Sequence, residues 1–209
     1  MKVFLPICLM ILSYLLGSIP FGILIGKLKG VDIRNYGSHN IGATNALRVL
    51  GPVLGILVFI LDFSKGAIPI ILTKYIINWP SDYPIYLIHP LIYGLLAILG
   101  HLFPVFLKFK GGKGISCFAG VMVLYCWQIS IIAFSTFIIV FLITKIVSIS
   151  SMLASLMLIV SYFILGIKDI PLLVMISLMF VLIVYKHRSN IMRLIKGEEN
   201  KIDFSKKEK

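Results

Sequence analysis

The stretch ISCFAGVMVLYCWQISIIAFSTFIIVFLI, Ile115–Ile143, decides how this chain is organised. It runs for about 29 residues without one Asp, Glu, Lys or Arg. About 20 apolar residues are enough to cross a bilayer as a helix. The run is therefore long for one crossing and short for two, and the choice sets the side of the membrane on which the rest of the chain lies.

The whole chain shares this apolar character. Of its 209 residues 59% are hydrophobic and 13% are charged, whereas soluble domains carry about 25% charged residues. We therefore predict an all-α polytopic membrane helix bundle, with residues 1–200 as a single integral membrane domain and 201–209 as a basic cytoplasmic tail. The other apolar segments are Val3–Leu28, Val49–Ile77, Ile85–Leu107, Met152–Ile167 and Ile170–Tyr185.

Basic residues indicate the topology, because Lys and Arg accumulate on the cytoplasmic side of membranes. They gather in Lys27–Arg48, in Lys108–Lys113 and from Lys186 to the C-terminus. If all three segments are cytoplasmic, an even number of crossings separates the last two, so Ile115–Ile143 crosses twice as two short halves with a break near Trp127–Ser130. This predicts about seven transmembrane helices, with the N-terminus outside and the C-terminus inside. One long tilted helix plus a missed crossing is the alternative.

The net charge of +12 is also attributed to the membrane setting of the chain. Basic loops attract anionic membrane lipids and can hold phosphorylated substrates, so membrane lipids are expected partners and nucleic acid is not. The three cysteines lie in apolar runs without CxxC spacing, which indicates small buried residues. The first apolar run lacks a small-residue cleavage site and is read as a retained helix.

Four polar stretches fall on the cytoplasmic face in this topology. The first is GSHNIGATN, Gly37–Asn45, followed by Arg48. Its small hydrogen-bonding side chains suit a polar cradle rich in backbone groups. An ordinary loop that caps the next helix through Thr44 or Asn45 is the alternative.

The second polar stretch is FLKFKGGKG, Phe106–Gly114. Its glycines permit positive φ and close backbone approach. Consecutive amides beside a helix start at Ile115 form an anion site, and Lys113 adds a positive charge at its centre. The spacing is not that of a P-loop. A flexible basic connector is the alternative.

The third and fourth polar stretches are KIVSISS, Lys145–Ser151, and KHRSNIMRL, Lys186–Leu194. The serines, at a predicted helix junction, either cap a helix or bind a ligand. His187 and Asn190 are three residues apart and share a helical face, while the arginines of this stretch alternatively hold lipid headgroups.

Asp62, Lys65 and His101 are ionisable residues in the interior of apolar runs. Asp62 and Lys65 are three residues apart, and ionisable groups inside a membrane are functional candidates. A self-neutralising structural pair is the favoured interpretation. His101 is read as a hydrogen-bonded packing residue.

Several catalytic motifs are missing from the sequence. It contains no DxxDG-type carboxylate cluster, no HExxH zinc motif and no GxSxG nucleophile motif. No metal or cofactor is expected, and amides, hydroxyls and cations are the groups left to hold an anionic substrate.

Taken together, the polar stretches resemble the bacterial acyl-phosphate:glycerol-3-phosphate acyltransferases, a family of integral membrane enzymes. The matching blocks cover nearly the whole chain and come in the family's order. The family's seven-helix fold agrees with the topology predicted above. The matching blocks are GSIPFG (17–22), GSHNIGATN (37–45), LDFSKGAIP (61–69), GHLFPVFLKFKGGKG (100–114), SISS (148–151) and HRSNIMRLIKGEE (187–199). His39, where the family usually has glycine, and Cys117, in a position usually small or hydroxylic, depart from the pattern.

The resemblance implies a reaction and a set of site residues. An acyl group would pass from a long-chain acyl-phosphate to the 1-hydroxyl of glycerol 3-phosphate, giving lysophosphatidic acid and phosphate in the first step of phospholipid synthesis. The implied catalytic residues are Ser38, Arg48, Lys113, Ser150, Ser151, His187 and Asn190, and the implied substrate-binding residues are Asn40, Thr44, Asn45, Gly111, Gly112, Gly114 and Glu198.

These residues permit a mechanism without a covalent intermediate, because an acyl-phosphate is already an activated mixed anhydride. Lys113, the loop amides, His187 and Asn190 are assigned to glycerol 3-phosphate. Arg48, Ser38, Asn40 and Thr44 are assigned to the acyl-phosphate head, and the two serines to the reacting centre. The hydroxyl proton goes either to His187 or to a substrate phosphate oxygen. The phosphate is favoured, because a histidine clamped on phosphate would be protonated.

The implied location is the cell inner (cytoplasmic) membrane, with the active site at its cytoplasmic face. The enzyme that supplies the acyl-phosphate is a further candidate partner. Two other functions compete. A small transporter of phosphorylated solutes would also use broken helices, but with a site near the midplane. A CDP-alcohol phosphatidyltransferase would need a carboxylate metal cluster.

Overall fold

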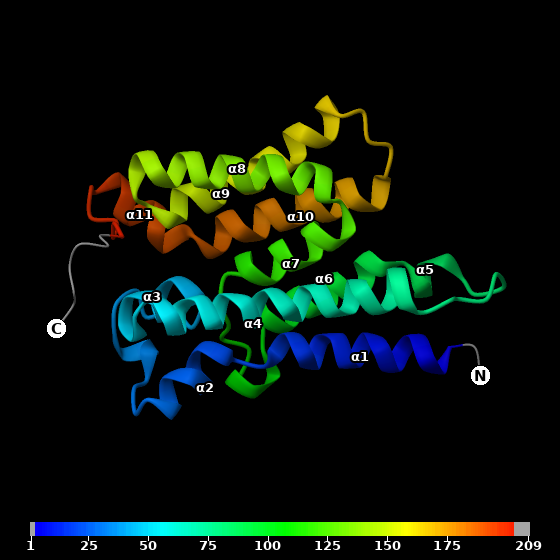
Figure 1. The fold of residues 1–209 in the computed structure, drawn as a ribbon, viewed down its shortest axis with the longest axis horizontal. Helices are drawn as coiled ribbons and strands as arrows, with labels where there is room; N and C mark the ends of the chain where they lie inside the picture. The colour runs from blue at the N-terminus through cyan, green and yellow to red at the C-terminus, as the bar shows by residue number, and fades with distance from the viewer. Residues whose placement is uncertain (1–2, 203–209) are drawn as a thin grey trace. The chain divides into compact units, whose positions relative to one another are not determined.

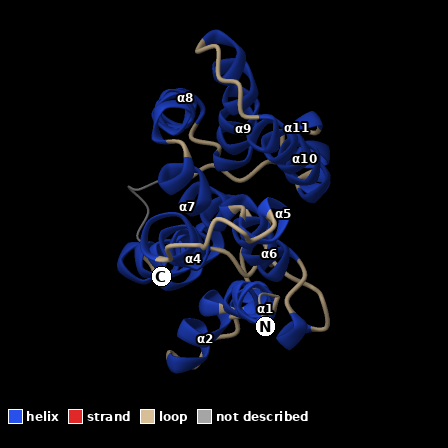
Figure 2. Cartoon of the chain, turned by 90° about the vertical axis from the view of Figure 1, so that its right-hand side faces the viewer, coloured by secondary structure: helices blue, strands red, loops and turns tan. Residues whose placement is uncertain are grey.

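The computed structural model describes residues 3–202, and over this range the chain consists of helices and loops (Figures 1 and 2). The all-α prediction is confirmed for these residues. In chain order the elements are α1 (Phe4–Ser18), α2 (Phe21–Leu28), the 3₁₀ helix η1 (Ile33–Asn35), α3 (Ala43–Leu50), α4 (Pro52–Ile70), the π-helix η2 (Ile71–Ile76), α5 (Ile85–Ile88), α6 (Pro90–Leu102), the 3₁₀ helix η3 (Val105–Leu107), α7 (Ile115–Tyr125), α8 (Trp127–Thr144), α9 (Val147–Ile164), α10 (Ile170–Lys186) and α11 (Arg188–Ile195).

The chain divides into two compact units, Met1–Trp127 and Gln128–Lys209. In the first unit α1 packs on α6, and α4 packs on α3, α6 and α7. In the second unit α9 packs on α10. The predicted basic tail, 201–209, lies outside the described residues from 203 onward.

Within the first unit, α4 and its π-helical extension η2 run parallel to α7. Near the start of α7, Gly66 lies so close to Cys117 that a Cβ on the glycine would be 2.0 Å from the cysteine carbonyl oxygen. At its end, Lys74 Nζ donates to the Tyr125 carbonyl over 2.7 Å. The later residues of α4 and η2 thus meet the later residues of α7, so the two segments run in the same direction.

The predicted first helix, Val3–Leu28, is broken in the structure. α1 ends at Ser18 and α2 begins at Phe21, with a 44° bend between them. Pro20 explains the break, because proline has no N–H for a helical bond and pushes the residue before it out of helical geometry. Ile19 accordingly adopts an extended conformation, with φ −63° and ψ 119°.

The predicted break in Ile115–Ile143 is confirmed, at Cys126 rather than within Trp127–Ser130. This residue has φ −144° and ψ 85°. The expectation of two similar halves is wrong, because α7 has 11 residues and α8 has 18. At 1.5 Å per residue α7 is only ~16 Å long.

Among residues 3–202, four helical segments are long and apolar enough to cross a membrane: Pro52–Ile76, Pro90–Leu107, Trp127–Thr144 and Val147–Ile164. Two bent pairs, Phe4–Ser18 with Phe21–Leu28 and Ile170–Lys186 with Arg188–Ile195, bring the number to six if each is one span. The shorter apolar helix α7 stands apart from this count.

In the second unit, α9 begins at Val147 rather than at the predicted Met152. The turn before it is held locally, since the Ile146 amide donates to Thr144 Oγ1 over 3.1 Å. The serines of the third polar stretch therefore lie in the first turns of a helix and not at the junction before it.

Candidate active site

The first polar stretch, Gly37–Asn45, connects η1 to α3 and is organised by Asn45. This side chain is 1% exposed. Its Nδ2 donates to the carbonyls of Ile33 (2.7 Å) and Asn40 (2.8 Å), and its Oδ1 accepts the Ser38 amide (2.8 Å). Asn45 therefore gives this loop its shape through contacts with the loop's own backbone.

The start of α3 differs from the capping alternative raised above. Its N-cap is Gly42, with no side-chain cap, so Thr44 and Asn45 both lie inside the helix. Asn40 Oδ1 accepts the Gly42 amide over 2.9 Å and closes the turn before the helix. Thr44 and Arg48 are half-buried and lie one turn apart on α3.

The second polar stretch places the glycine loop, Gly111–Gly114, against the end of α6. The Gly112 amide donates to the His101 carbonyl over 3.1 Å. A Cβ on Gly111 would lie 2.2 Å from that carbonyl oxygen, and a Cβ on Gly112 would lie 2.3 Å from His101 Nε2. Both positions therefore need glycine for close approach, whereas the left-handed φ of +83° belongs to Gly114.

Lys113 stands immediately before the N-terminus of α7, whose N-cap is Gly114. Its side chain is half-buried. The first amides of a helix have no partner within it and, with the helix dipole, favour an anion at this end. Lys113 and the start of α7 thus provide positive charge and N–H donors in one place.

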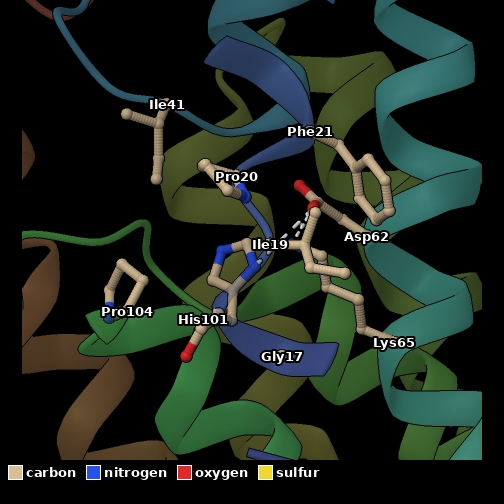
Figure 3. Close-up of a pocket in the computed structure, with 10 residues that line it drawn as sticks. Gly17, Ile19, Pro20, Phe21, Ile41, Asp62, Lys65, His101 and Pro104 are labelled. Carbon is tan, nitrogen blue, oxygen red and sulfur yellow. Dashed lines mark ion pairs between the residues drawn. The ribbon is translucent and has the colours of Figure 1, made fainter. Parts of the chain in front are cut away.

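One small pocket is bordered by the first stretch and by residues that contact the second (Figure 3). Ile41 comes from the first stretch, and His101 and Pro104 lie beneath the second. Asp62 and Lys65 line the same pocket from α4. The fold thus brings Gly37–Asn45 and Gly111–Gly114 to the same end of this unit.

In the second unit, the third and fourth polar stretches meet at Glu199. Its Oε1 accepts from Ser148 Oγ (2.8 Å) and from Asn190 Nδ2 (2.6 Å), and its Oε2 accepts from Arg193 Nε (2.8 Å). The chain after Glu199 stays in contact with the second unit, because the Ile202 amide donates to the Lys145 carbonyl over 2.9 Å. This carboxylate ties the start of α9 to α11.

The charge on Glu199 is stabilised by its partners. Burial alone would raise the pKa of this carboxyl, but the hydrogen bonds from Asn190, Ser148 and Arg193 outweigh it and lower the pKa below the ordinary glutamate value. Sequence reasoning chose Glu198 instead, whose side chain is exposed in the structure. Nothing in the local pattern distinguishes two adjacent glutamates after a glycine.

His187 and Asn190 are buried at the junction of α10 and α11. His187 Nδ1 lies 2.8 Å from the Ile183 carbonyl oxygen, which can only accept, so Nδ1 carries the hydrogen and the ring is fixed in orientation. Ser150 and Ser151 are buried in the first turns of α9, where Ser150 Oγ donates to the Ile146 carbonyl over 2.8 Å.

The site residues thus form two groups, one in each unit. Of the residues predicted from the sequence, the first unit holds Ser38, Asn40, Thr44, Asn45, Arg48, Gly111, Gly112, Lys113 and Gly114, and the second holds Ser150, Ser151, His187, Asn190 and Glu198. Across residues 3–202, no group of three or more His, Cys, Asp and Glu side chains is arranged to hold a metal ion.

Comparisons with known proteins point to one family. The family model described as glycerol-3-phosphate acyltransferase matches residues 7–197. A glycerol-3-phosphate acyltransferase of Bacillus velezensis is 43% identical over 94% of this chain and 97% of its own length. A glycerol-3-phosphate acyltransferase 2 of Lactobacillus acidophilus is 45% identical over 94% of this chain and 90% of its own.

Two solved structures are also similar to this chain. Both are of PlsY (YgiH), described as an integral membrane glycerol 3-phosphate acyltransferase. Its glycerol 3-phosphate form has a TM-score of 0.84 and 40% identity, covering 95% of this chain and 96% of the other. Its lysophosphatidic acid form has a TM-score of 0.82 and 39% identity, covering 95% of each.

Proposed function

The chain belongs to the glycerol-3-phosphate acyltransferase family, and from this premise we propose that it acylates the 1-hydroxyl of glycerol 3-phosphate with acyl-phosphate as the donor. The hydroxyl oxygen bonds to the acyl carbon, the bond from that carbon to the phosphate oxygen breaks, and the proton passes to phosphate. The products are lysophosphatidic acid and inorganic phosphate, in the first step of phospholipid synthesis.

One observation carries this function. The chain matches, over 95% of its length, a protein whose solved forms are named for glycerol 3-phosphate and for lysophosphatidic acid. These are the acceptor and the product of the proposed reaction. Acyl-phosphate as donor is supported by the side chains present, which are cations, amides and hydroxyls suited to two phosphates.

In the first unit, Lys113 and the first amides of α7 bind the phosphate of glycerol 3-phosphate. Arg48, Ser38 and Thr44 bind the head of the acyl-phosphate. Neutralising both phosphates lets two anionic reactants approach, and holding the hydroxyl beside the carbonyl supplies much of the reduction in the barrier. The role of Asn45, and of Asn40 in part, is to shape the loop that presents these groups.

In the second unit, His187 and Asn190 contact glycerol 3-phosphate, and Ser150 and Ser151 donate near the reacting carbonyl. Glu199 joins this set as the residue that orients Asn190. A phosphate oxygen of the substrate takes the hydroxyl proton, because a histidine bound to phosphate is protonated and is a poor base.

We propose seven crossings, with α7 as the seventh beside the four long spans and two bent pairs. Because α4 and α7 run parallel, they start at the same end of the first unit, where both of its polar stretches lie. This end faces the cytoplasm, and the acyl tail lies between helices open to the inner leaflet of the cytoplasmic membrane. The enzyme that makes acyl-phosphate is its partner in delivering the donor.

Accessibility labelling tests this topology. Single cysteines at Ser38, Lys110 and Ser189, with Cys8, Cys117 and Cys126 replaced by alanine, should react with an impermeant maleimide only when the cytoplasmic side of the membrane is opened. A cysteine at Asp82, between η2 and α5, is the control for the opposite side. Labelling of the three sites from different sides would refute a shared active site.

One assay tests the reaction. Purified protein is given glycerol 3-phosphate and palmitoyl-phosphate in the presence of EDTA, and released phosphate and lysophosphatidic acid are measured. We expect the two products in equal amounts, and none with palmitoyl-CoA as the donor. Acyl transfer from palmitoyl-CoA but not from palmitoyl-phosphate would overturn the proposal. Phosphate release without acylation of glycerol 3-phosphate would also overturn it.

A further inference from the structure

Three ionisable side chains are buried together in the lining of this pocket (Figure 3). Lys65 Nζ lies 2.7 Å from Asp62 Oδ1, and His101 Nδ1 lies 3.8 Å from the same oxygen. The three residues, called here the buried trio, are at most 5% exposed. Two come from α4 and the third from the end of α6.

A gain in folding stability does not explain why the buried trio carries charged groups. Moving two charges out of water costs several kcal/mol per ion. Replacing a buried ion pair with well-packed apolar residues is often neutral or stabilising. Ionisable groups at membrane depth are accordingly rare and usually functional. Lys65 is further enclosed by Phe21, whose ring centroid is 4.9 Å from Nζ.

His101 is the point at which the buried trio meets the glycine loop. Its carbonyl accepts the Gly112 amide, and its ring nitrogen Nε2 lies 2.3 Å from the position that a Cβ of Gly112 would take. The loop backbone therefore rests on the histidine ring and on its main chain. Since Asp62 faces the other nitrogen of this ring, the carboxylate on α4 influences where the loop lies.

The pocket that the buried trio lines also includes a residue of the first polar stretch. Ile41 and Pro20 line the pocket above His101 and Asp62. A Cβ on Gly22, close to Pro20, would lie 2.0 Å from the Ile41 carbonyl oxygen, so this part of the stretch also packs closely. The buried trio thus lies beneath both loops that the first unit contributes.

We propose that Asp62, Lys65 and His101 position the glycine loop so that Lys113 and the amides beside it meet the phosphate of glycerol 3-phosphate; this role rests on the function proposed above. The trio touches no substrate. Its charged pair orients the His101 ring, the ring supports Gly112, and the main chain of His101 supports Gly111. Displacing a binding group by about 1 Å can cost roughly 100-fold in rate.

The test is the double variant Asp62→Leu/Lys65→Met, which removes both charges and keeps the volume. We expect a folded protein with a melting temperature near that of the wild type, and a KM for glycerol 3-phosphate raised about tenfold or more. The KM for palmitoyl-phosphate should change less than about twofold. Ser64→Ala, between the two positions on the same helix, is the matched control and should leave both values unchanged.

Hydrogen exchange gives a readout that does not depend on activity. Amides of residues 108–114 should exchange faster in the double variant than in the wild type, with α9 and α10 unchanged. Unchanged KM and unchanged exchange in the folded variant would overturn the positioning role. If the double variant is not recovered folded, His101→Gln is measured for the same two outcomes.

The two proposals can fail separately. A wild-type protein without acyl transfer would refute the function, and the exchange comparison would still decide whether the buried trio orders the loop. An active wild type whose variants keep the wild-type KM and exchange would leave the function in place and refute the positioning role.

Discussion

The side-chain amide of Asn190 donates to Glu199 Oε1 over 2.6 Å, and this hydrogen bond joins a predicted site residue to one that the sequence reading passed over. The same carboxylate holds Ser148 on α9 and Arg193 on α11. A single side chain therefore fixes the distance between the serines of α9 and the His187–Asn190 pair. Its neighbour Glu198 is exposed, which provides a control one residue away.

Glu199→Gln should destabilise the protein by about 1–3 kcal/mol, the usual contribution of hydrogen bonds to a charged group. The glutamine keeps the shape but loses the charge-assisted bond from Arg193. Thermal unfolding of purified protein in detergent measures the change. Glu198→Gln should leave the melting temperature as it is, and equal losses in the two variants would contradict the assignment.

The stabilisation from Glu199 should depend on pH. Its pKa is lowered in the folded protein, so its contribution is complete above the unfolded value of about 4.3 and is lost as the pH falls through the lower folded value. The stability difference between the wild type and Glu199→Gln should accordingly narrow below about pH 4. A difference that is constant from neutral to acid pH would show that the charge is not involved.

Lys113→Ala should lower kcat/KM by about 100-fold or more, because one preorganised charge at a phosphate is commonly worth this much. Membrane insertion and the melting temperature should be unchanged. Lys110→Ala is the control, since this lysine is exposed in the same stretch. Near-normal rates for Lys113→Ala would remove the glycine loop from the active site.

His187→Ala should raise the KM for glycerol 3-phosphate about tenfold or more and lower kcat by a smaller factor. This is expected if the imidazole binds phosphate and a substrate oxygen accepts the proton. Steady-state kinetics with saturating palmitoyl-phosphate separate the two effects, with His89→Asn, at the N-cap of α6, as a control. A large loss of kcat at unchanged KM would instead make His187 the base.

Gly112→Ala should reduce activity at least about tenfold, because its Cβ would meet His101 Nε2 at 2.3 Å. Gly30→Ala is the contrasting change. Gly30 has a left-handed φ of +72° and open space around it, so it should lose about 1 kcal/mol of stability and no activity. Equal activity in the two variants would mean that the loop tolerates displacement.

The sequence predicted the helical class, the positions of most apolar segments and the break in Ile115–Ile143. It did not predict that α7 would be the shorter piece. The end of α7 is held by Lys74 donating to the Tyr125 carbonyl and by Tyr75 Oη donating to the Leu124 carbonyl over 2.7 Å. Such contacts join residues far apart in the chain, and hydrophobic periodicity carries no information about them.

The polar stretches were found because small polar and basic residues interrupt apolar runs. The sequence did not show which residues within these stretches bind a ligand and which hold the local structure. Asn45 resembles a ligand in the sequence but bonds to its own loop in the structure, and the SISS serines begin a helix rather than cap one. These roles depend on which way a side chain faces, which is decided by packing between segments.

The backbone bond from Ile202 to Lys145 has a practical consequence for handling the protein. The chain is still part of the packed structure after α11 has ended, so shortening it at the last helical residue would cut away Glu199 together with its partner interactions. Affinity tags and reporter fusions at this terminus should therefore be attached through a spacer beyond residue 202.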